Sequence, residues 1–326
     1  MAPFLARRFA SFVLTLAAAS AVVFWMLDVL PGNVAQVMLG ESATTESIAA
    51  LEAKLGLDRP ALARYGDWVR GMATGELGTS IAYDTPVGEL IAERLRVTVP
   101  LALLAMALTT LLAFAFGLFA ASRHRRAGDV AVMAASQVGI AIPNFWFAIL
   151  LILAFAVNLR WVSAGGFPGW SADDGGGLLN LSGVAAGLRA LVLPAVALAV
   201  VQASILARIV RSAVVDVMRE DFVRTARAKG VSRRGVLLGH VLRNALVPVL
   251  TVMGLQFANL LTGTVVIENV FSLPGLGRLV FQAIANRDLL VVRNAVMLLA
   301  ATVVVINFAV DVLYVVVDPR LRTRRG

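Results

Sequence analysis

Six uncharged apolar runs limit how this chain of 326 residues can fold more than any other feature of its sequence. A helix needs about 20 mainly apolar residues to cross the hydrocarbon core of a bilayer, and the runs are of about that length or longer. They are continuously apolar rather than alternating, which excludes the strands of a membrane barrel. Because backbone groups in lipid must be satisfied within the segment, we predict an all-α integral membrane protein with six transmembrane helices. The runs cover residues 9–27, 97–122, 130–159, 190–207, 244–267 and 294–310, and the last continues past Asp311 to Val317.

The distribution of basic residues predicts how these helices are oriented. With the amino terminus in the cytoplasm, the basic segments fall on the cytoplasmic side, where lysine and arginine accumulate in membrane proteins. The opposite side receives residues 31–96, in which acidic residues outnumber basic ones. Topology thus explains the net charge of +9, and nucleic acid is not an expected partner. Both termini are predicted to be cytoplasmic; the basic residues on that side are Arg7, Arg8, Arg123, Arg125, Arg126, those of 208–243, Arg320, Arg322, Arg324 and Arg325.

The runs and the segments between them divide the chain into four parts. Residues 1–30 hold the cytoplasmic amino terminus and the first transmembrane helix, and 31–96 form an external, periplasmic segment. Residues 97–320 form a five-helix core with a long cytoplasmic loop at 208–245, and 321–326 form a cytoplasmic tail. The first run resembles a secretory signal peptide, but it continues to Leu27 without a polar cleavage region. We therefore expect a retained transmembrane helix.

The external segment 31–96 has the spacing of short helices. Ile48 and Leu51 recur at a helical interval, and Tyr65 and Trp68 lie on one face of a second predicted helix. Such a cap can shield the ends of the membrane helices or offer a surface to an external partner, and the spacing does not separate the two. A second external region, 160–189, is rich in glycine, which predicts a flexible connection.

The stretch from Asp221 to Pro248 is a charged loop between two apolar runs. Asp221 begins a short predicted helix, where the macrodipole favours negative charge, and Lys229 with Gly230 ends it. Ser232 can cap a second helix, before Pro248 marks the first turns of the next crossing. The loop is therefore predicted to be a helix, a glycine hinge and a helix.

The first of these helices carries Phe222 beside the small residues Ala226 and Ala228. A groove on another protein can accept one aromatic side chain with little other bulk around it. The alternative is a basic loop held against anionic lipid headgroups, and the spacing alone favours neither.

The sequence RTARAKG at 224–230 is similar to the cytoplasmic coupling loop, or EAA loop, of ABC importer permeases, in the form found in the dipeptide and oligopeptide branch. Arg224 and Thr225 stand where the generic motif has Glu and Ala, whereas Ala226 and Gly230 match it. Most of the chain resembles the first membrane subunit of that branch, in segments that follow the same order. These are LGLDRP at 55–60, GELGTS at 75–80, NFWFAILLI from Asn144, WVSAGG from Trp161, LARIVRSAVVDVMREDFVRTARAKG from Leu206, VVIENVFSLPGLGRL from Val265, NRDLLVV from Asn286 and DPR at 318–320.

The resemblance implies a type I ABC importer permease in the bacterial inner membrane, which forms half of a translocation pathway. Its implied partners are a second, homologous permease in a heterodimer, two cytoplasmic ABC ATPases, an extracytoplasmic solute-binding protein and membrane lipid. No cofactor is expected on this chain, since ATP and Mg would be used by the ATPases. The residues that the resemblance places against the ATPase are Asp221, Phe222, Arg224, Thr225, Ala226, Ala228, Lys229 and Gly230.

The same resemblance makes the external segment and the stretch 271–288 the expected contact for the binding protein. An exposed turn with no partner would have a similar composition. The candidate docking residues are Tyr65, Trp68, Asn286, Arg287 and Asp288.

Polar residues within the apolar runs can line the passage for a polar solute. Inside helix bundles such residues more often join helices by hydrogen bonds, which is the alternative here. Gln256, Asn259 and Gly263 share one face of a helix, and Pro143 and Pro194 can kink the helices that contain them. The candidate pathway residues are Gln137, Asn144, Gln202, Gln256, Asn259 and Thr262.

Other functional classes have less support in the sequence. A secondary transporter or channel without an ATPase is the alternative, yet Asp311 is the one acid well inside a run, and pairing with Arg208, Arg211 or water explains it better than proton relay. The chain has no cysteine, and its two histidines, His124 and His240, lie outside the runs. It also lacks a phosphate-binding G-x-x-x-x-G-K-[ST] loop, so neither an enzyme nor an ATPase is expected. The solute stays open among dipeptides, longer peptides, glutathione, nickel and other compounds.

Overall fold

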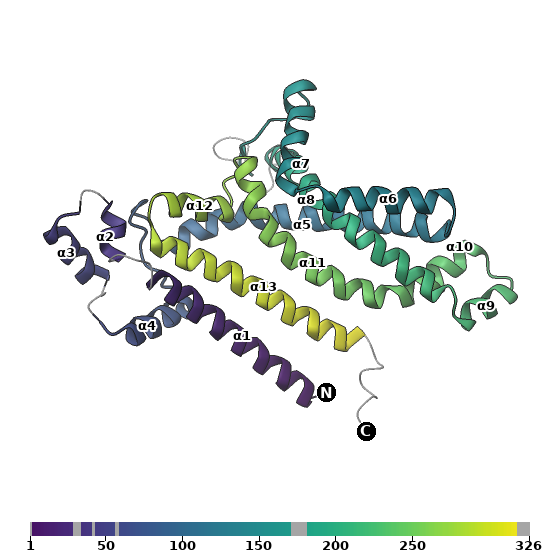
Figure 1. The fold of residues 1–326 in the computed structure, drawn as a ribbon, viewed down its shortest axis with the longest axis horizontal. Coiled ribbons are helices and arrows are strands. Elements are labelled where there is room, and N and C mark those ends of the chain that lie inside the picture. The colour runs from purple at the N-terminus through teal and green to yellow at the C-terminus, as the bar shows by residue number, and fades with distance from the viewer. Residues whose placement is uncertain (1, 29–33, 41–42, 56–58, 171–180, 318–326) are drawn as a thin grey trace. The chain divides into compact units, whose positions relative to one another are not determined.

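The computed structural model describes residues 2–28, 34–40, 43–55, 59–170 and 181–317. Within these ranges the chain is helical apart from its turns and one isolated bridge between Thr79 and Pro86, which confirms the predicted all-α class (Figure 1). The elements are α1 (Ala2–Asp28), α2 (Val34–Leu39), α3 (Thr45–Leu55), α4 (Ala61–Thr74), α5 (Val87–Ser122), α6 (Ala127–Ala141), α7 (Asn144–Leu151), the π-helical η2 (Ile152–Asn158), α8 (Leu181–Val217), α9 (Asp221–Ala228), α10 (Arg233–Gly235), the π-helical η3 (Val236–Val241), α11 (Leu242–Val270), α12 (Leu276–Ala285) and α13 (Leu289–Val317).

Five helical stretches among the described residues are long and apolar enough to cross a membrane. They lie in α1, α5, α8, the continuous stretch Arg233–Val270 and α13. The sixth predicted crossing is a pair of helices, α6 and α7 with η2, which bend by 100°. Proline has no N–H and disfavours helical backbone in the residue before it, and Ile142, before Pro143, is extended at φ −84° and ψ 123°. The expected kink is thus a break, and there are six spans if the bent pair is one.

One compact unit contains the described residues of 99–273 and 306–326. Here α8 packs against α6 and α11, and small residues allow close approach of the helices. A Cβ atom at Gly117 of α5 would lie 2.8 Å from the carbonyl oxygen of Ala207 on α8, and one at Gly139 of α6 would clash with the side chain of Ser204 on α8. Glycine at these two positions therefore allows α5 and α6 to approach α8 closely.

The second compact unit contains residues 2–98 and 274–305. The aromatic rings of Phe24 on α1 and Tyr65 on α4 meet edge to face at 5.3 Å between centroids, and Trp68 lies beside them. The hydroxyl groups of Ser20 and Tyr65 are 2.7 Å apart. In a separate cluster, α12 packs its apolar face against the beginnings of α5 and α13, where Val87 and Val291 are fully buried.

The glycine-rich region 160–189 is described at 160–170 and at 181–189. The first part has defined contacts, and the second part begins α8 instead of forming the expected flexible connection. The N–H of Gly166 donates to the carbonyl oxygen of Phe271 at 2.9 Å, and Arg189 donates to the carbonyl oxygen of Trp161 at 2.7 Å. Residues 171–180, which contain the Gly175–Gly177 run, lie outside the described residues. The loop is therefore held at both of its described ends.

Candidate functional site

Helix α9 is a short amphipathic helix between α8 and the long helix that begins at Arg233. Its first turn carries Asp221, whose carboxylate lies 3.5 Å from the guanidinium of Arg224, and both side chains are largely exposed. Negative charge at this end stabilises the helix through the macrodipole, as the sequence predicted. Phe222 projects with 41% of its surface exposed.

The carboxyl end of α9 is a Schellman motif, in which glycine adopts the left-handed conformation. The N–H of Val231 donates to Ala226 at 3.2 Å, and the N–H of Gly230 donates to Arg227 at 2.9 Å. Gly230 has φ +83°, and a Cβ atom there would meet nothing within 4 Å. Backbone conformation alone therefore requires glycine at this position, and the predicted helix stop is confirmed.

Beyond this turn the second helix differs from the short one expected. The hydroxyl oxygen of Ser232 accepts the N–H of Gly235 at 3.2 Å, which confirms the predicted cap. The helix then continues without interruption through η3 into α11 and ends at Val270. Pro248 lies inside this helix rather than near its start. Residues 229–232 therefore separate α9 from a helix that is long and apolar enough to cross a membrane.

Two inward side chains seat α9 on the rest of its unit. Val223 is fully buried and Ala226 is 8% exposed, at the i and i+3 positions of one face. They join an apolar cluster with α5, α8, η3 and α11. Ala226 was expected on the accepting surface, but it faces the protein interior. The exposed residues of α9 among the candidates are Asp221, Phe222, Arg224, Thr225 and Ala228, followed by Lys229 and Gly230.

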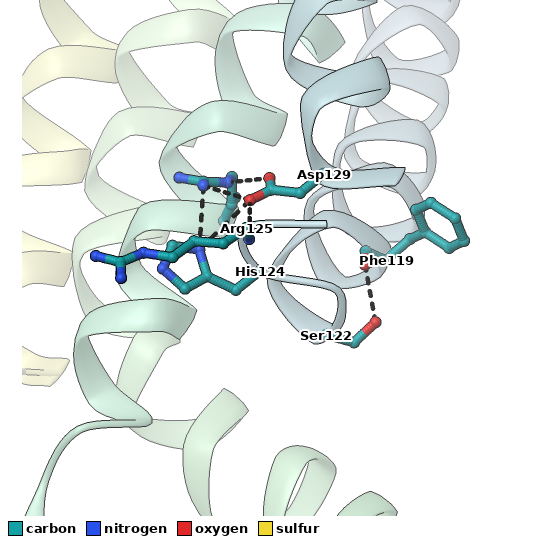
Figure 2. A network of polar contacts seen from close by, with 6 residues as sticks. Phe119, Ser122, His124, Arg125 and Asp129 are labelled. Carbon is teal, nitrogen blue, oxygen red and sulfur yellow. Dashed lines mark hydrogen bonds and ion pairs between the residues drawn. The ribbon is translucent and has the colours of Figure 1, made fainter. Parts of the chain in front are cut away.

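A buried ion pair joins the turn between α5 and α6 to α8, and sequence reasoning missed it. Asp129, in the first turn of α6, has a side chain only 3% exposed. Arg211 of α8 donates from Nε to Oδ1 at 2.5 Å and from Nη2 to Oδ2 at 2.6 Å. The backbone N–H of Arg125 donates to Oδ2 at 2.9 Å, and Nδ1 of His124 lies 3.2 Å from Nη2 of Arg211 (Figure 2). We call these four residues the Asp129 network.

The network shows which residue pairs with Arg211. Arg211 was expected as a possible partner of Asp311, and the structure instead pairs it with Asp129 through two parallel hydrogen bonds, the strongest geometry for arginine and carboxylate. The signal in the sequence was a single acid three residues after the basic turn 123–126. Arg208, the other candidate partner, donates to Gln137 at 3.5 Å.

The candidate pathway residues do not share one environment. Gln202 and Gln256 are buried, and Nε2 of Gln256 donates to the backbone oxygen of Gln202 at 3.1 Å, which is the helix-joining role weighed as the alternative. Gln137, Asn259 and Thr262 are exposed, and Asn144 is half-buried at the start of α7. On the proposed face of α11, Asn259 is therefore exposed, whereas Gln256 is buried and hydrogen-bonded to α8.

The candidate docking residues likewise include both buried and exposed side chains. Trp68 is 7% exposed, and its indole N–H donates to Asn294 at 2.8 Å. Tyr65 is half-buried against Phe24. Trp68 thus belongs to the apolar face of α4 that packs on α1 instead of facing solvent, and docking of a binding protein at these residues stays a prediction. Asn286 and Arg287 are exposed.

Asp288 is also buried, at 1% exposure, and organises the turn before α13. Its Oδ2 accepts the hydroxyl of Ser80 at 2.5 Å and the N–H of Ala82 at 3.2 Å, while Oδ1 accepts the N–H of Val291 at 3.2 Å. The expected rim contact is thus a structural carboxylate. Among the described residues, no group of three or more His, Asp or Glu side chains gathers as a metal site would require.

The fold resembles a solved membrane transporter. A chain of the inward-facing MetNI methionine ABC transporter matches with a TM-score of 0.53 at 18% identity, over 72% of this chain and 98% of that one. At this level of identity the likeness concerns the fold alone, which this chain shares with a chain of that transporter.

Comparison of sequences identifies the family. The model of the binding-protein-dependent transport system inner membrane component matches residues 113–323, and the model of the N-terminal part of such membrane components matches 1–102. The chain therefore belongs to the inner membrane components of binding-protein-dependent transport systems, and it is a multi-pass permease. A Brucella abortus protein assigned as a peptide transport system permease is 40% identical over 99% of both chains. The di/tripeptide permease protein DppB of Pseudomonas aeruginosa is 36% identical over 100% of both, and the glutathione permease protein GsiC of Salmonella choleraesuis is 36% identical over 99% of both.

Proposed function

We propose that this chain is one of two permease subunits in an ATP-driven importer of peptides or similarly small polar solutes. The names of its full-length relatives support this solute class. The proposal includes a second, different permease, an extracytoplasmic binding protein, two ATPases that use ATP and Mg, and cytoplasmic termini for this chain. The observation that carries it is α9, which offers one exposed aromatic side chain on a helix held by two buried ones.

In this proposal the exposed face of α9 docks on the ATPase. The face presents Phe222 with little bulk at Thr225 and Ala228, and such a surface suits a groove that receives one ring. Closure of the nucleotide-bound ATPases would displace α9, and the continuous helix from Arg233 would carry the displacement into the membrane. Phe222, rather than Ala226, is therefore the proposed contact.

Cross-linking tests the docking directly, because the chain has no native cysteine. Phe222→Cys and Ala228→Cys place a thiol on the exposed face, and Val223→Cys places one on the buried face of the same helix. In the assembled transporter, a thiol-to-amine reagent should join the two exposed variants to the ATPase and leave Val223→Cys unlinked. Equal linkage of all three, or linkage of none, would contradict docking through this face.

The solute class needs a separate measurement. Mass spectrometry of the ligand retained by the cognate binding protein after native purification should identify a peptide or a compound of similar size and polarity. Transport of the identified ligand by proteoliposomes that contain the whole complex should require ATP. Uptake without ATP would favour a secondary transporter or channel.

A further inference from the structure

A basic pocket of about 350 Å³ lies where α8 ends and the long helix begins. Arg227 on α9 and Arg233 and Arg234 on α10 line it, together with Ser122 at the end of α5. All of these elements belong to one compact unit. The pocket is distinct from the outward face of α9 that carries Phe222, which is not among its lining residues.

The charge of this pocket is not balanced within its own segment. From Phe222 to Asn244 the sequence has six basic residues and no acidic one. Arg227, Arg233 and Arg234 are exposed, and within the described part of the chain none of the three forms an ion pair. Guanidinium groups bind phosphate through paired hydrogen bonds, so three of them around one cavity suit a phosphate-bearing ligand.

Apolar side chains form the rest of the pocket lining and restrict the class of ligand that fits it. Met218, Leu237 and Val241 line it, and Val241 is fully buried. Leu238, which follows Leu237 in the sequence, is 58% exposed. Free phosphate would gain nothing from such a lining, whereas a phospholipid places methylenes directly beside its phosphate. Basic residues beside exposed apolar ones are also typical of a segment at the membrane surface.

We propose that this pocket binds an acidic phospholipid. The three guanidinium groups hold the headgroup phosphate, and the glycerol and the first acyl methylenes lie against Met218 and Leu237. The lipid would join the carboxyl end of α9 and the start of the long helix to the bilayer surface. This site depends on the membrane location of the family and not on docking of an ATPase at α9.

Lipid retention by the purified full-length chain tests the proposal without any ATPase present. Native mass spectrometry during titration with phosphatidylglycerol or phosphatidylcholine in detergent should show preference for phosphatidylglycerol. Each arginine near a membrane surface contributes about a 5-fold gain in affinity for acidic lipid, so R233Q/R234Q should weaken phosphatidylglycerol binding by about 30-fold. R233K/R234K should restore most of it, and Arg219→Gln, exposed and outside the pocket, should have little effect.

A second variant separates a pocket from diffuse surface charge. Ser122→Trp adds bulk at the exposed end of α5 without changing the charge, and it should also weaken phosphatidylglycerol binding. Unchanged binding by Ser122→Trp, or equal losses for Arg219→Gln and R233Q/R234Q, would overturn the proposal. Displacement of the lipid by millimolar inorganic phosphate would assign the site to a free anion instead. Loss of ATPase co-purification in R233Q/R234Q with lipid retention unchanged would assign it to the ATPase.

Discussion

Helices α9 and α12 are both short and amphipathic, yet they are held in place in different ways. In α12, five of ten residues are buried, and the turn that follows is fixed by the carboxylate of Asp288. In α9, two of eight residues are buried, and no side chain of the preceding residue caps its amino end. Few buried contacts mean a low free energy of local displacement. The comparison indicates that α12 is a fixed part of its unit, whereas α9 can be displaced at a low cost in free energy.

The largest effect is expected where a buried charge loses its partner. In unit 99–273, Arg211→Gln leaves the carboxylate of Asp129 buried without its two charged hydrogen bonds. Removing one member of such a pair costs about 3–5 kcal/mol. The variant should lose most of its thermal stability in detergent, measured as the fraction that stays monodisperse after heating.

The double variant D129N/R211Q is the control for this pair, because it removes the unpaired charge. It should be more stable than Arg211→Gln alone, by a double-mutant comparison of the heating midpoints. Equal stability of the two variants would show that the Asp129 network does not fix the α5–α6 turn.

The second largest effect on stability is expected at Asp288, the carboxylate in the turn after α12. Asp288→Ala leaves the Ser80 hydroxyl and the N–H groups of Ala82 and Val291 without their acceptor. Because Asp288 is 1% exposed, we expect destabilisation by about 3 kcal/mol, measured as a fall in the unfolding midpoint. Asn286→Ala, exposed two residues earlier, should stay within about 0.5 kcal/mol of the parent. If the two variants were equally mild, α12 would be no better fixed than α9.

The buried apolar side chain of α9, Val223, should have a smaller effect on stability than Asp288. It should have a larger effect on the coupling of ATP hydrolysis to solute. Val223→Ala removes fully buried methyl groups, at a cost of about 1–2 kcal/mol that falls on the docking of α9. ATP hydrolysis by the assembled transporter should then depend less on solute. Thr225→Ala, on the exposed face of the helix, is the stability control. A large fall in the global unfolding midpoint of Val223→Ala would show that α9 is not locally displaceable.

The smallest expected effect concerns the turn after α9. Gly230→Ala costs about 1 kcal/mol through the left-handed backbone alone, since a Cβ atom there meets nothing. Gly239→Ala is a matched control, because Gly239 also has open space around it but lies within a helical segment without positive φ. The control should be neutral or slightly stabilised in a thermal assay. Equal losses would show that the Schellman turn does not depend on glycine.

Local signals in the sequence were sufficient for much of α9. Asp221 at its start, Gly230 at its stop and Ser232 as the next cap all act through neighbours a few residues away, so spacing revealed them. The direction in which Ala226 points was not local, because it depends on which face of α9 meets the cluster built from other helices. The same reason explains the burial of Trp68, because the apolar face of α4 packs against α1 rather than facing solvent.

The sequence did not predict the hydrogen-bonded pairs whose residues lie far apart in the chain. Asp129 and Arg211 are separated by 82 residues, and Ser80 and Asp288 by 208. Nothing in the spacing of either pair distinguishes a buried carboxylate from an exposed one. The bend at Pro143 was expected, but its size of 100° depends on how α7 packs against α8 and α11.

The sequence by itself determined the number of apolar segments, the helical class, the family and the punctuation of α9, because length, hydropathy and capping are properties of neighbouring residues. Only the tertiary structure decided which polar groups are used inside the protein. It turned Trp68 and Asp288 inward, committed Gln256 to a second helix and left Phe222 exposed. Burial depends on which segments meet in space, and an isolated polar residue in one segment does not specify the other segment that covers it.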